Sequence, residues 1–229
     1  MSKNNKDSAE ITLTERIEGS LNNFLAKNKM IVIIIAAVII VALITLGIVS
    51  SVNQKNLQAQ FDQVDQLEKS YAELQAMGSD DAAYQAKYDE LLAGLQDLSG
   101  KGKKYPSLKA EYLLGMVAFE KEEYQKALDS FVSVYSKATD NYLGSLSLTN
   151  AAVSAEELEN DTLALEYYTK VIDEFGMTAA EAPKALFAQA RLQEKSGNME
   201  LAKATFQQLA DAFPTSEFAK LATNRLALL

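Results

Sequence analysis

The sequence predicts an all-α protein, with a single N-terminal transmembrane helix followed by an α-solenoid of helical hairpins. Three observations predict this fold class. One long apolar stretch lacks charge, the rest of the chain spaces its apolar residues by three and four, and a pair of a small residue and an aromatic one returns at a fixed interval. The 229 residues are enough for one or two domains.

The apolar stretch covers residues 30–49, of which 14 are Ile, Val or Leu. At about 1.5 Å per residue, a helix of this length spans about 30 Å, the hydrocarbon thickness of a bilayer. A cleaved signal peptide is the alternative, but its apolar core usually has about 7–15 residues. Small residues at Ser50 and Ser51 leave cleavage open. We predict a transmembrane helix that contacts membrane lipid over residues 30–49.

Charges on either side of the apolar stretch predict its orientation. Lys27 and Lys29 precede it, whereas the first basic residue after it is Lys55, and acidic residues follow. By the positive-inside rule, residues 1–29 are cytoplasmic and the chain beyond the stretch lies outside the cytoplasm. The cytoplasmic segment also contains a short amphipathic helix, which either lies at the lipid headgroups or contacts a membrane partner. Its apolar stripe is Ile17, Leu21, Phe24 and Leu25.

Residues 50–105 predict a long helix, a second helix and a linker. Spacings of three and four residues run from Leu57 to Met77 and again from Tyr84 to Leu98, which favours a helical hairpin. A dimeric coiled coil is the alternative for the first stripe, although it covers only about three heptads. The linker reads SGKGKKYP at residues 99–106, with two Gly, one Pro and three Lys.

Residues 106–214 contain an internal repeat. Ala127, Ala164 and Ala202 recur at an interval of about 38 residues, which is typical of helical-repeat solenoids. Each alanine is followed four positions later by an aromatic residue. Two antiparallel helices that cross closely admit only a small side chain at the crossing, and the aromatic residue fills the space toward the next unit. The aromatic residues are Phe131, Tyr168 and Phe206.

The repeat units resemble tetratricopeptide repeats. In the first unit, Leu114 and Gly115 occupy the family's Leu-Gly position. The third unit matches at Ala190, Gly197 and the terminal Pro214, whereas the second has Ala152 in place of Gly and Gly176 where Pro is usual. The resemblance implies three tetratricopeptide-type repeats over residues 106–214.

Residues 215–229 predict a final helix that begins after Pro214, with Thr215 or Ser216 as its N-cap. A solenoid needs such a helix to cover its last apolar face. The apolar residues expected on that face are Phe218, Leu221 and Leu226.

Composition argues against an enzyme. The chain has no Cys, His or Trp, so thiolate nucleophiles, Ser–His pairs and the common zinc sites are excluded. The GKGKK sequence at residues 100–104 lacks the spacing of a phosphate-binding loop. We therefore expect no catalytic residues, no metal or other cofactor and no small-molecule substrate.

Net charge argues against a nucleic-acid partner. The whole chain has a formal net charge of −9, and residues 30–229 carry 17 basic and 27 acidic side chains. Such a surface repels phosphate backbones. Protein partners are the remaining class.

The resemblance also implies a partner-binding groove lined by the first helix of each unit. An apolar groove of this kind suits an amphipathic helix or an extended apolar segment. The alternative is that the same side chains pack against the preceding hairpin, residues 53–98. The groove residues implied are Tyr112, Met116, Phe119, Thr149, Val153, Phe187 and Arg191.

The order of the segments is similar to that of the ancillary-subunit family of the bacterial Sec translocon. That resemblance implies a single-pass protein of the inner membrane, with its N-terminus in the cytoplasm and its repeat domain in the periplasm. Its implied function is to assist protein translocation or periplasmic chaperoning, with the translocon, a periplasmic chaperone or exported clients as partners. The alternative is a structural scaffold of an envelope or cell-division complex.

Overall fold

A computed structural model describes residues 13–78, 80–138 and 142–229. Within these residues it contains ten helices and no strand, which confirms the all-α prediction. The chain divides into two compact units, residues 1–57 (unit 1) and residues 58–229 (unit 2). The helices are α1 Leu13–Lys27, α2 Lys29–Ala76, α3 Tyr84–Ser99, α4 Tyr105–Glu120, α5 Tyr124–Lys137, α6 Tyr142–Glu157, α7 Asp161–Phe175, α8 Ala182–Lys195, α9 Met199–Ala212 and α10 Glu217–Leu226.

Unit 1 contains α1 and the first part of α2. The side chains of Ile17, Leu21 and Phe24 on α1 are exposed, as are the Ile, Val and Leu side chains between Ile31 and Val49 apart from the half-buried Val32. Among the described residues, α2 is the one helix that is long and apolar enough to cross a membrane, by length and composition. Residues 1–12 of the predicted cytoplasmic segment lie outside the described part of the chain.

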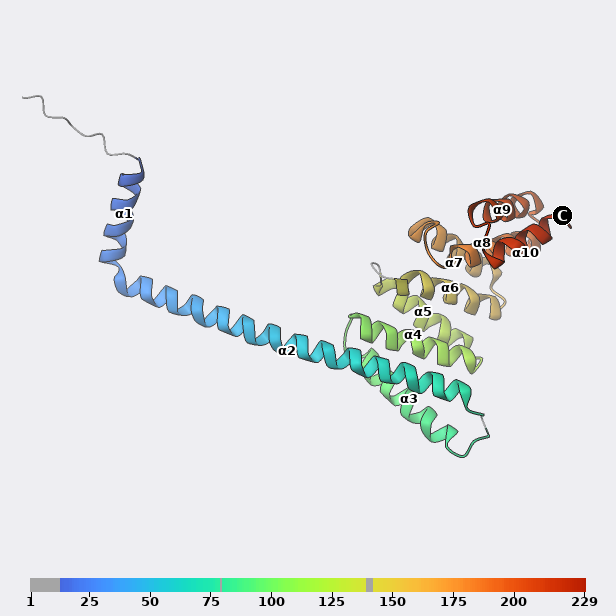
Figure 1. Ribbon diagram of the computed structural model, residues 1–229, viewed down its shortest axis with the longest axis horizontal. Coiled ribbons are helices and arrows are strands. Elements are labelled where there is room, and N and C mark those ends of the chain that lie inside the picture. Colours follow the sequence, from blue (N-terminus) through green and yellow to red (C-terminus); the bar gives the residue numbers. More distant parts are fainter. Residues whose placement is uncertain (1–12, 79, 139–141) are drawn as a thin grey trace, which may run out of the picture. The chain divides into compact units, whose positions relative to one another are not determined.

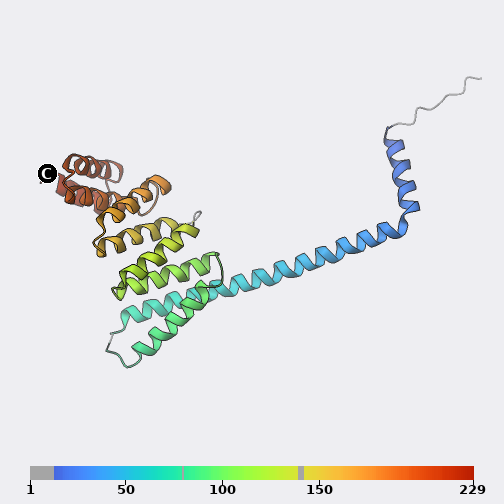
Figure 2. The ribbon, with the colours of Figure 1, turned by 180° about the vertical axis from the view of Figure 1, so that it is seen from behind.

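Unit 2 is a stack of helices, in which each helix from α3 to α9 packs against the one that follows it (Figures 1 and 2). The small and aromatic residues of the predicted repeat are all buried in this stack. Ala127, Ala164 and Ala202 are fully buried, and so are the three aromatic residues that follow them. This burial confirms the α-solenoid predicted from the repeat interval.

The close helix crossing is visible at Gly115 of α4. A Cβ atom at this position would lie 2.7 Å from Cε1 of Phe131 on α5, closer than real side chains approach. The glycine therefore lets α4 and α5 meet over the phenyl ring.

The turns inside the α4–α5, α6–α7 and α8–α9 hairpins share one backbone conformation. Glu122, Glu159 and Gly197 adopt positive φ angles of 59°, 56° and 84°, and each lies in the turn between the two helices of its hairpin. Only glycine adopts this left-handed conformation without steric cost. The α8–α9 hairpin therefore has the residue that the turn favours, while the α4–α5 and α6–α7 hairpins hold a glutamate there.

The last helix, α10, covers the end of the stack, and one of the three apolar residues predicted to face it, Leu221, does not. Leu221 is 49% exposed, whereas Ala219 and Ala222 are buried. Alanine allows α10 to approach α9 closely, so the predicted apolar stripe is wrong at Leu221. Phe218 and Leu226 do pack against the C-terminal core cluster, and the Ser216 side chain caps the helix by accepting from the backbone N–H of Phe218.

Candidate functional site

Helices α4, α6 and α8, together with residues 58–76 of α2, are the first helices of successive hairpins, and we call them the A helices. Polar side chains join each A helix to the next. Between α2 and α4, the Tyr71 hydroxyl donates to Glu120 at 2.5 Å, and Lys109 pairs with Glu68 at 2.8 Å. Between α4 and α6, the Asn150 amide donates to the Tyr112 hydroxyl at 2.8 Å.

We call this series of polar links between A helices the ladder, and it continues toward the C-terminus. The Ser145 hydroxyl of α6 donates to Glu181, the residue that precedes α8, at 2.7 Å. Arg191 of α8 pairs with Glu156 of α6, and Arg225 of α10 pairs with Glu194 of α8. These links join each A helix to the next along the stack.

The seven predicted groove residues do not form one continuous surface. Tyr112 and Thr149 are 8% and 1% exposed, which places both in the interior. Thr149 donates to the Ser145 carbonyl of its own helix at 2.9 Å. Phe187 packs against Phe206 and Phe218, with ring centroids 5.6 and 5.9 Å apart, so it belongs to the C-terminal core.

The remaining four residues are partly or fully accessible. Met116 and Phe119 of α4 and Val153 of α6 are half-buried, and Arg191 is exposed. Met116 lies beside Asn150, with its sulfur 3.7 Å from the amide nitrogen. Met116 and Phe119 also border the core cluster that contains residues of α2. The α2–α3 hairpin therefore covers part of the α4–α5 hairpin. This agrees with the alternative prediction, in which the groove side chains pack against residues 53–98.

Sequence reasoning missed the polar residues of the ladder. A signal for part of it exists, since Glu156 and Glu194 are separated by one interval of the repeat. Each pairs with an arginine of the next A helix or of α10, at Arg191 and Arg225. A glutamate repeating at the period of the solenoid indicates a repeated inter-helix contact.

Several tyrosines that take part in these inter-helix contacts have a raised pKa. Burial, with a hydrogen bond to Glu120, raises the pKa of Tyr71, and burial beside Glu156 raises the pKa of Tyr168. Burial also raises the pKa of Tyr112 to about 12. These hydroxyls therefore stay protonated at neutral pH and act as hydrogen-bond donors or acceptors that hold helices together, a structural role.

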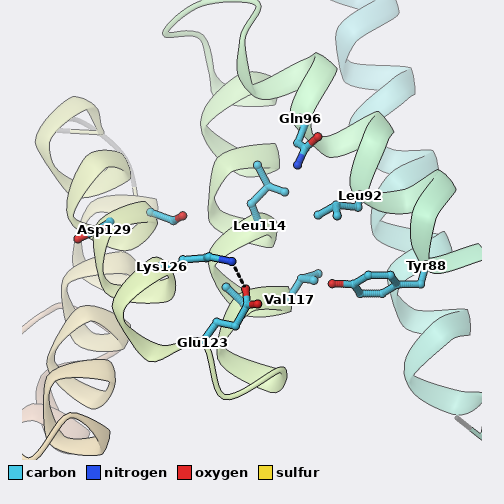
Figure 3. Close-up of a pocket in the computed structure, with 10 residues that line it drawn as sticks. Tyr88, Leu92, Gln96, Leu114, Val117, Glu123, Lys126 and Asp129 are labelled. Atoms are coloured by element: carbon cyan, nitrogen blue, oxygen red, sulfur yellow. Dashed lines mark hydrogen bonds and ion pairs between the residues drawn. The ribbon is translucent and has the colours of Figure 1, made fainter. Parts of the chain in front are cut away.

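A second surface lies between α3, α4 and α5 (Figure 3). It is a pocket of about 480 Å³ in which Tyr88 and Leu92 of α3 face Leu114 and Val117 of α4. On the α5 side the lining is polar, and Lys126 pairs with Glu123 at 2.9 Å. Tyr88 and Leu92 lie within the helical spacing from Tyr84 to Leu98, but such periodicity cannot tell a buried position from the wall of an open pocket.

An ammonium group lies next to this pocket. Lys121 Nζ is 5.2 Å from the ring centroid of Tyr84 and 4.8 Å from that of Tyr88, which are distances typical of cation–π contacts. No group of three or more acidic side chains that could hold a metal ion lies among the described residues. The pocket between α3, α4 and α5 thus offers apolar contact area with a polar edge, which is suited to binding a polypeptide.

A tetratricopeptide repeat family model matches residues 184–216, which comprise most of α8 and all of α9. This part of the chain is similar to a single tetratricopeptide repeat. A protein of Treponema pallidum (strain Nichols), named as a TPR repeat-containing protein, is 27% identical over 152 residues. The match covers 65% of this chain and 62% of that relative, so the chain spans less than two thirds of the relative's length.

A solved structure shows the same fold. The crystal structure of a tetratricopeptide repeat protein from Parabacteroides merdae is 22% identical and superimposes with a TM-score of 0.54, covering 72% of this chain and 59% of that one. The Arabidopsis OM64 TPR domain is 20% identical, with a TM-score of 0.45, and the match covers 53% of this chain and 94% of that domain. Unit 2 is an all-α solenoid of the tetratricopeptide type.

Proposed function

We propose that this chain is a membrane-anchored interaction module, in which residues 30–49 hold the solenoid at a bilayer. The observation that carries this proposal is the length and composition of the apolar segment: among the described residues, only α2 is long and apolar enough to cross a membrane. In water such a segment is unfavourable, whereas insertion of its branched aliphatic side chains gains about 4–8 kcal/mol.

The orientation follows from charge. Lys27 and Lys29 stand before the apolar segment, and the chain after it is acidic, which favours a cytoplasmic N-terminus. In a bacterium this places unit 2 in the periplasm. The order of segments, similar to that of the ancillary-subunit family of the Sec translocon, supports a role in protein translocation or periplasmic chaperoning at the inner membrane.

The partner is a protein segment with an apolar face. The accessible side chains of Met116, Phe119 and Val153 give the A helices an apolar strip, and methionine adapts its shape to different partners. The tetratricopeptide-type fold usually acts as a scaffold for binding and carries no catalytic groups of its own.

Alkaline carbonate extraction of membranes that contain the full chain tests the anchor. We expect the protein to remain in the membrane pellet, because a spanning helix is held by the hydrophobic effect and is insensitive to charge. Reporters fused to either end then fix the orientation. Release into the supernatant, or a C-terminus on the cytoplasmic side, would refute the proposal.

The binding surface is tested by a photo-crosslinking amino acid at Met116 or Val153, with Gln207 on α9 as the matched control. Gln207 is exposed and lies outside the A helices. We expect adducts with a translocon subunit, a chaperone or an exported client at the first two positions and none at the third. Equal adducts at all three positions, or adducts only with a division-complex component, would contradict this assignment.

A further inference from the structure

The loop between α3 and α4 concentrates positive charge in an otherwise acidic unit. Its three lysines, Lys101, Lys103 and Lys104, are all exposed. Lys101 pairs with Asp97 at 2.7 Å and donates to Gln63 at 3.3 Å. Among the described residues, Lys103 and Lys104 have no ion pair and no hydrogen bond from their side chains. Two ammonium groups are therefore available to an external ligand.

Aromatic side chains stand directly behind the loop. Tyr105 stacks on Phe61 of α2, with ring centroids 5.8 Å apart, and its hydroxyl lies 2.8 Å from that of Tyr142. Tyr142 is 54% exposed. Tyrosine is the residue type that proteins favour at the boundary between lipid and water, because its ring is apolar and its hydroxyl is polar.

The loop lies beside the residues with which unit 2 begins. Its contacts with Gln63, and those of Tyr105 with Phe61, place it at the first turns of α2 within that unit. The chain from Val49 to Phe61 corresponds to about 18 Å of helix. Between Val49 and Phe61 the only charged residue is Lys55, and the carboxylates of α2 begin at Asp62.

We propose that the loop Lys101–Lys104 binds the anionic headgroups of the bilayer in which residues 30–49 are anchored. This inference rests on the proposed membrane anchor. Each lysine near an anionic bilayer surface favours contact by about fivefold. The short connection to the anchor raises the local concentration of headgroups around the loop. The remaining acidic surface is repelled by the same headgroups, so the loop decides which end of unit 2 approaches the membrane.

Because the natural sequence has no cysteine, a single introduced cysteine can carry a fluorophore. Ser99→Cys places the label at the end of α3 beside the loop, and Gln207→Cys on α9 provides the control. The full chain is reconstituted in vesicles of phosphatidylcholine alone, or with an equal part of phosphatidylglycerol, that contain a lipid with a quenching headgroup. We expect stronger quenching at Ser99→Cys in the anionic vesicles and no such difference at Gln207→Cys.

The lysines themselves are tested in the Ser99→Cys background. Lys103→Gln with Lys104→Gln is expected to lower the ratio of contacting to free loops about 25-fold in anionic vesicles. The control, Lys195→Gln with Lys220→Gln, removes the same charge from two exposed lysines elsewhere and is expected to leave quenching unchanged. Equal quenching in both kinds of vesicle, or equal effects of the two double variants, would overturn the proposal.

Two further measurements separate the possible failures. Carbonate extraction of the same vesicles reports on the anchor, so release of the protein refutes the anchor, while retention without quenching refutes the loop alone. Inorganic phosphate added at constant ionic strength tests the source of the anion. We expect quenching to persist, and its loss would overturn the assignment to lipid.

Discussion

Single residues set the closest approaches in this solenoid. Gly115 of α4 lies against the buried ring of Phe131, and Ala127, Ala164 and Ala202 occupy the corresponding crossings with no exposed surface. A tightly packed interior has little room for added atoms, so these positions depend on side-chain size.

Gly115→Ala is expected to lower the free energy of unfolding. The clash with Phe131 costs about 1–3 kcal/mol, which exceeds the gain of about 1 kcal/mol from replacing a helical glycine. Urea unfolding followed by circular dichroism measures the change. Gly100→Ala is the control, since its Cβ would lie 3.7 Å from its nearest neighbours and is expected to change stability by less than about 0.5 kcal/mol. A stabilised Gly115→Ala variant would contradict the packing argument.

Tyr112 is expected to make stability depend on alkaline pH. Its pKa is raised by burial to about 12, above the value of about 10 in the unfolded chain. The contribution of the protonated Tyr112 hydroxyl to the free energy of unfolding is therefore complete below about pH 10, and it is lost as the pH rises from about 10 to about 12. Urea midpoints across this range should fall less steeply for Tyr112→Phe than for the natural chain. Identical slopes would show that this hydroxyl is not protected from ionisation.

At the scale of elements, side-chain links between neighbouring A helices hold the stack in register. Glu156 is the clearest example, because it accepts from Tyr168 at 2.8 Å and pairs with Arg191 of the next A helix. The two contacts differ in exposure. Tyr168 is buried, whereas the side chain of Arg191 is 46% exposed.

Glu156→Ala is therefore expected to cost more than Arg191→Ala. Removing the carboxylate leaves the buried Tyr168 hydroxyl without its acceptor, at about 1–3 kcal/mol, while losing an exposed ion pair costs about 0–1 kcal/mol. Denaturant unfolding of both variants gives the comparison. In the Glu156→Ala background, Tyr168→Phe should cost less than it does in the natural chain. Equal costs for the two alanine variants would exclude the buried hydrogen bond as the dominant contact.

The face that α10 buries can be tested in the same way. Ala222→Leu is expected to destabilise by about 1–3 kcal/mol, because Ala222 has no exposed surface and the site cannot accept a larger side chain. Leu221→Ala, at the adjacent exposed position, is expected to change stability by less than about 0.5 kcal/mol. Thermal unfolding of the two variants gives the comparison. A larger loss of stability for Leu221→Ala than for Ala222→Leu would show that Leu221 is the buried residue, as the sequence predicted.

At the scale of the whole molecule, the chain combines a unit that has its own core with an apolar segment that has the length and composition of a membrane-spanning helix. Unit 2 buries Val64, Tyr71 and Leu74 of α2 in the same core cluster as residues of α3 and α4. The later part of α2 is therefore a structural element of the solenoid, whatever solvent surrounds residues 30–49.

A fragment of residues 58–229 is expected to be soluble and to unfold cooperatively. It retains the core contacts of unit 2 and lacks the exposed apolar segment. A fragment of residues 84–229 is the control, and it should be less stable because the loss of α2 uncovers Tyr112 and its neighbours on α4. Far-UV circular dichroism and gel filtration report the outcome. Equal stability of the two fragments would show that α2 does not contribute to the core.

The accessible surface was the least predictable feature. The resemblance implied seven groove residues, yet Tyr112 and Thr149 are buried, and Phe187 belongs to the C-terminal core. The pocket beside Tyr88 and Leu92 was not predicted at all. Helical spacing identifies which side of a helix is apolar, but neighbouring helices decide how much of that side they cover. The groove remains a prediction at Met116, Phe119, Val153 and Arg191.

The sequence by itself determined the helical class, the repeat interval and the apolar segment, because each depends on local periodicity and composition. Only the tertiary structure decided the ladder of Glu120, Asn150 and Glu156, the burial of Ala222 in place of Leu221, and the placement of the lysine loop beside Phe61. Those features join residues that are far apart in the chain. They depend on how helices rotate and approach one another, which is set by packing across the whole core.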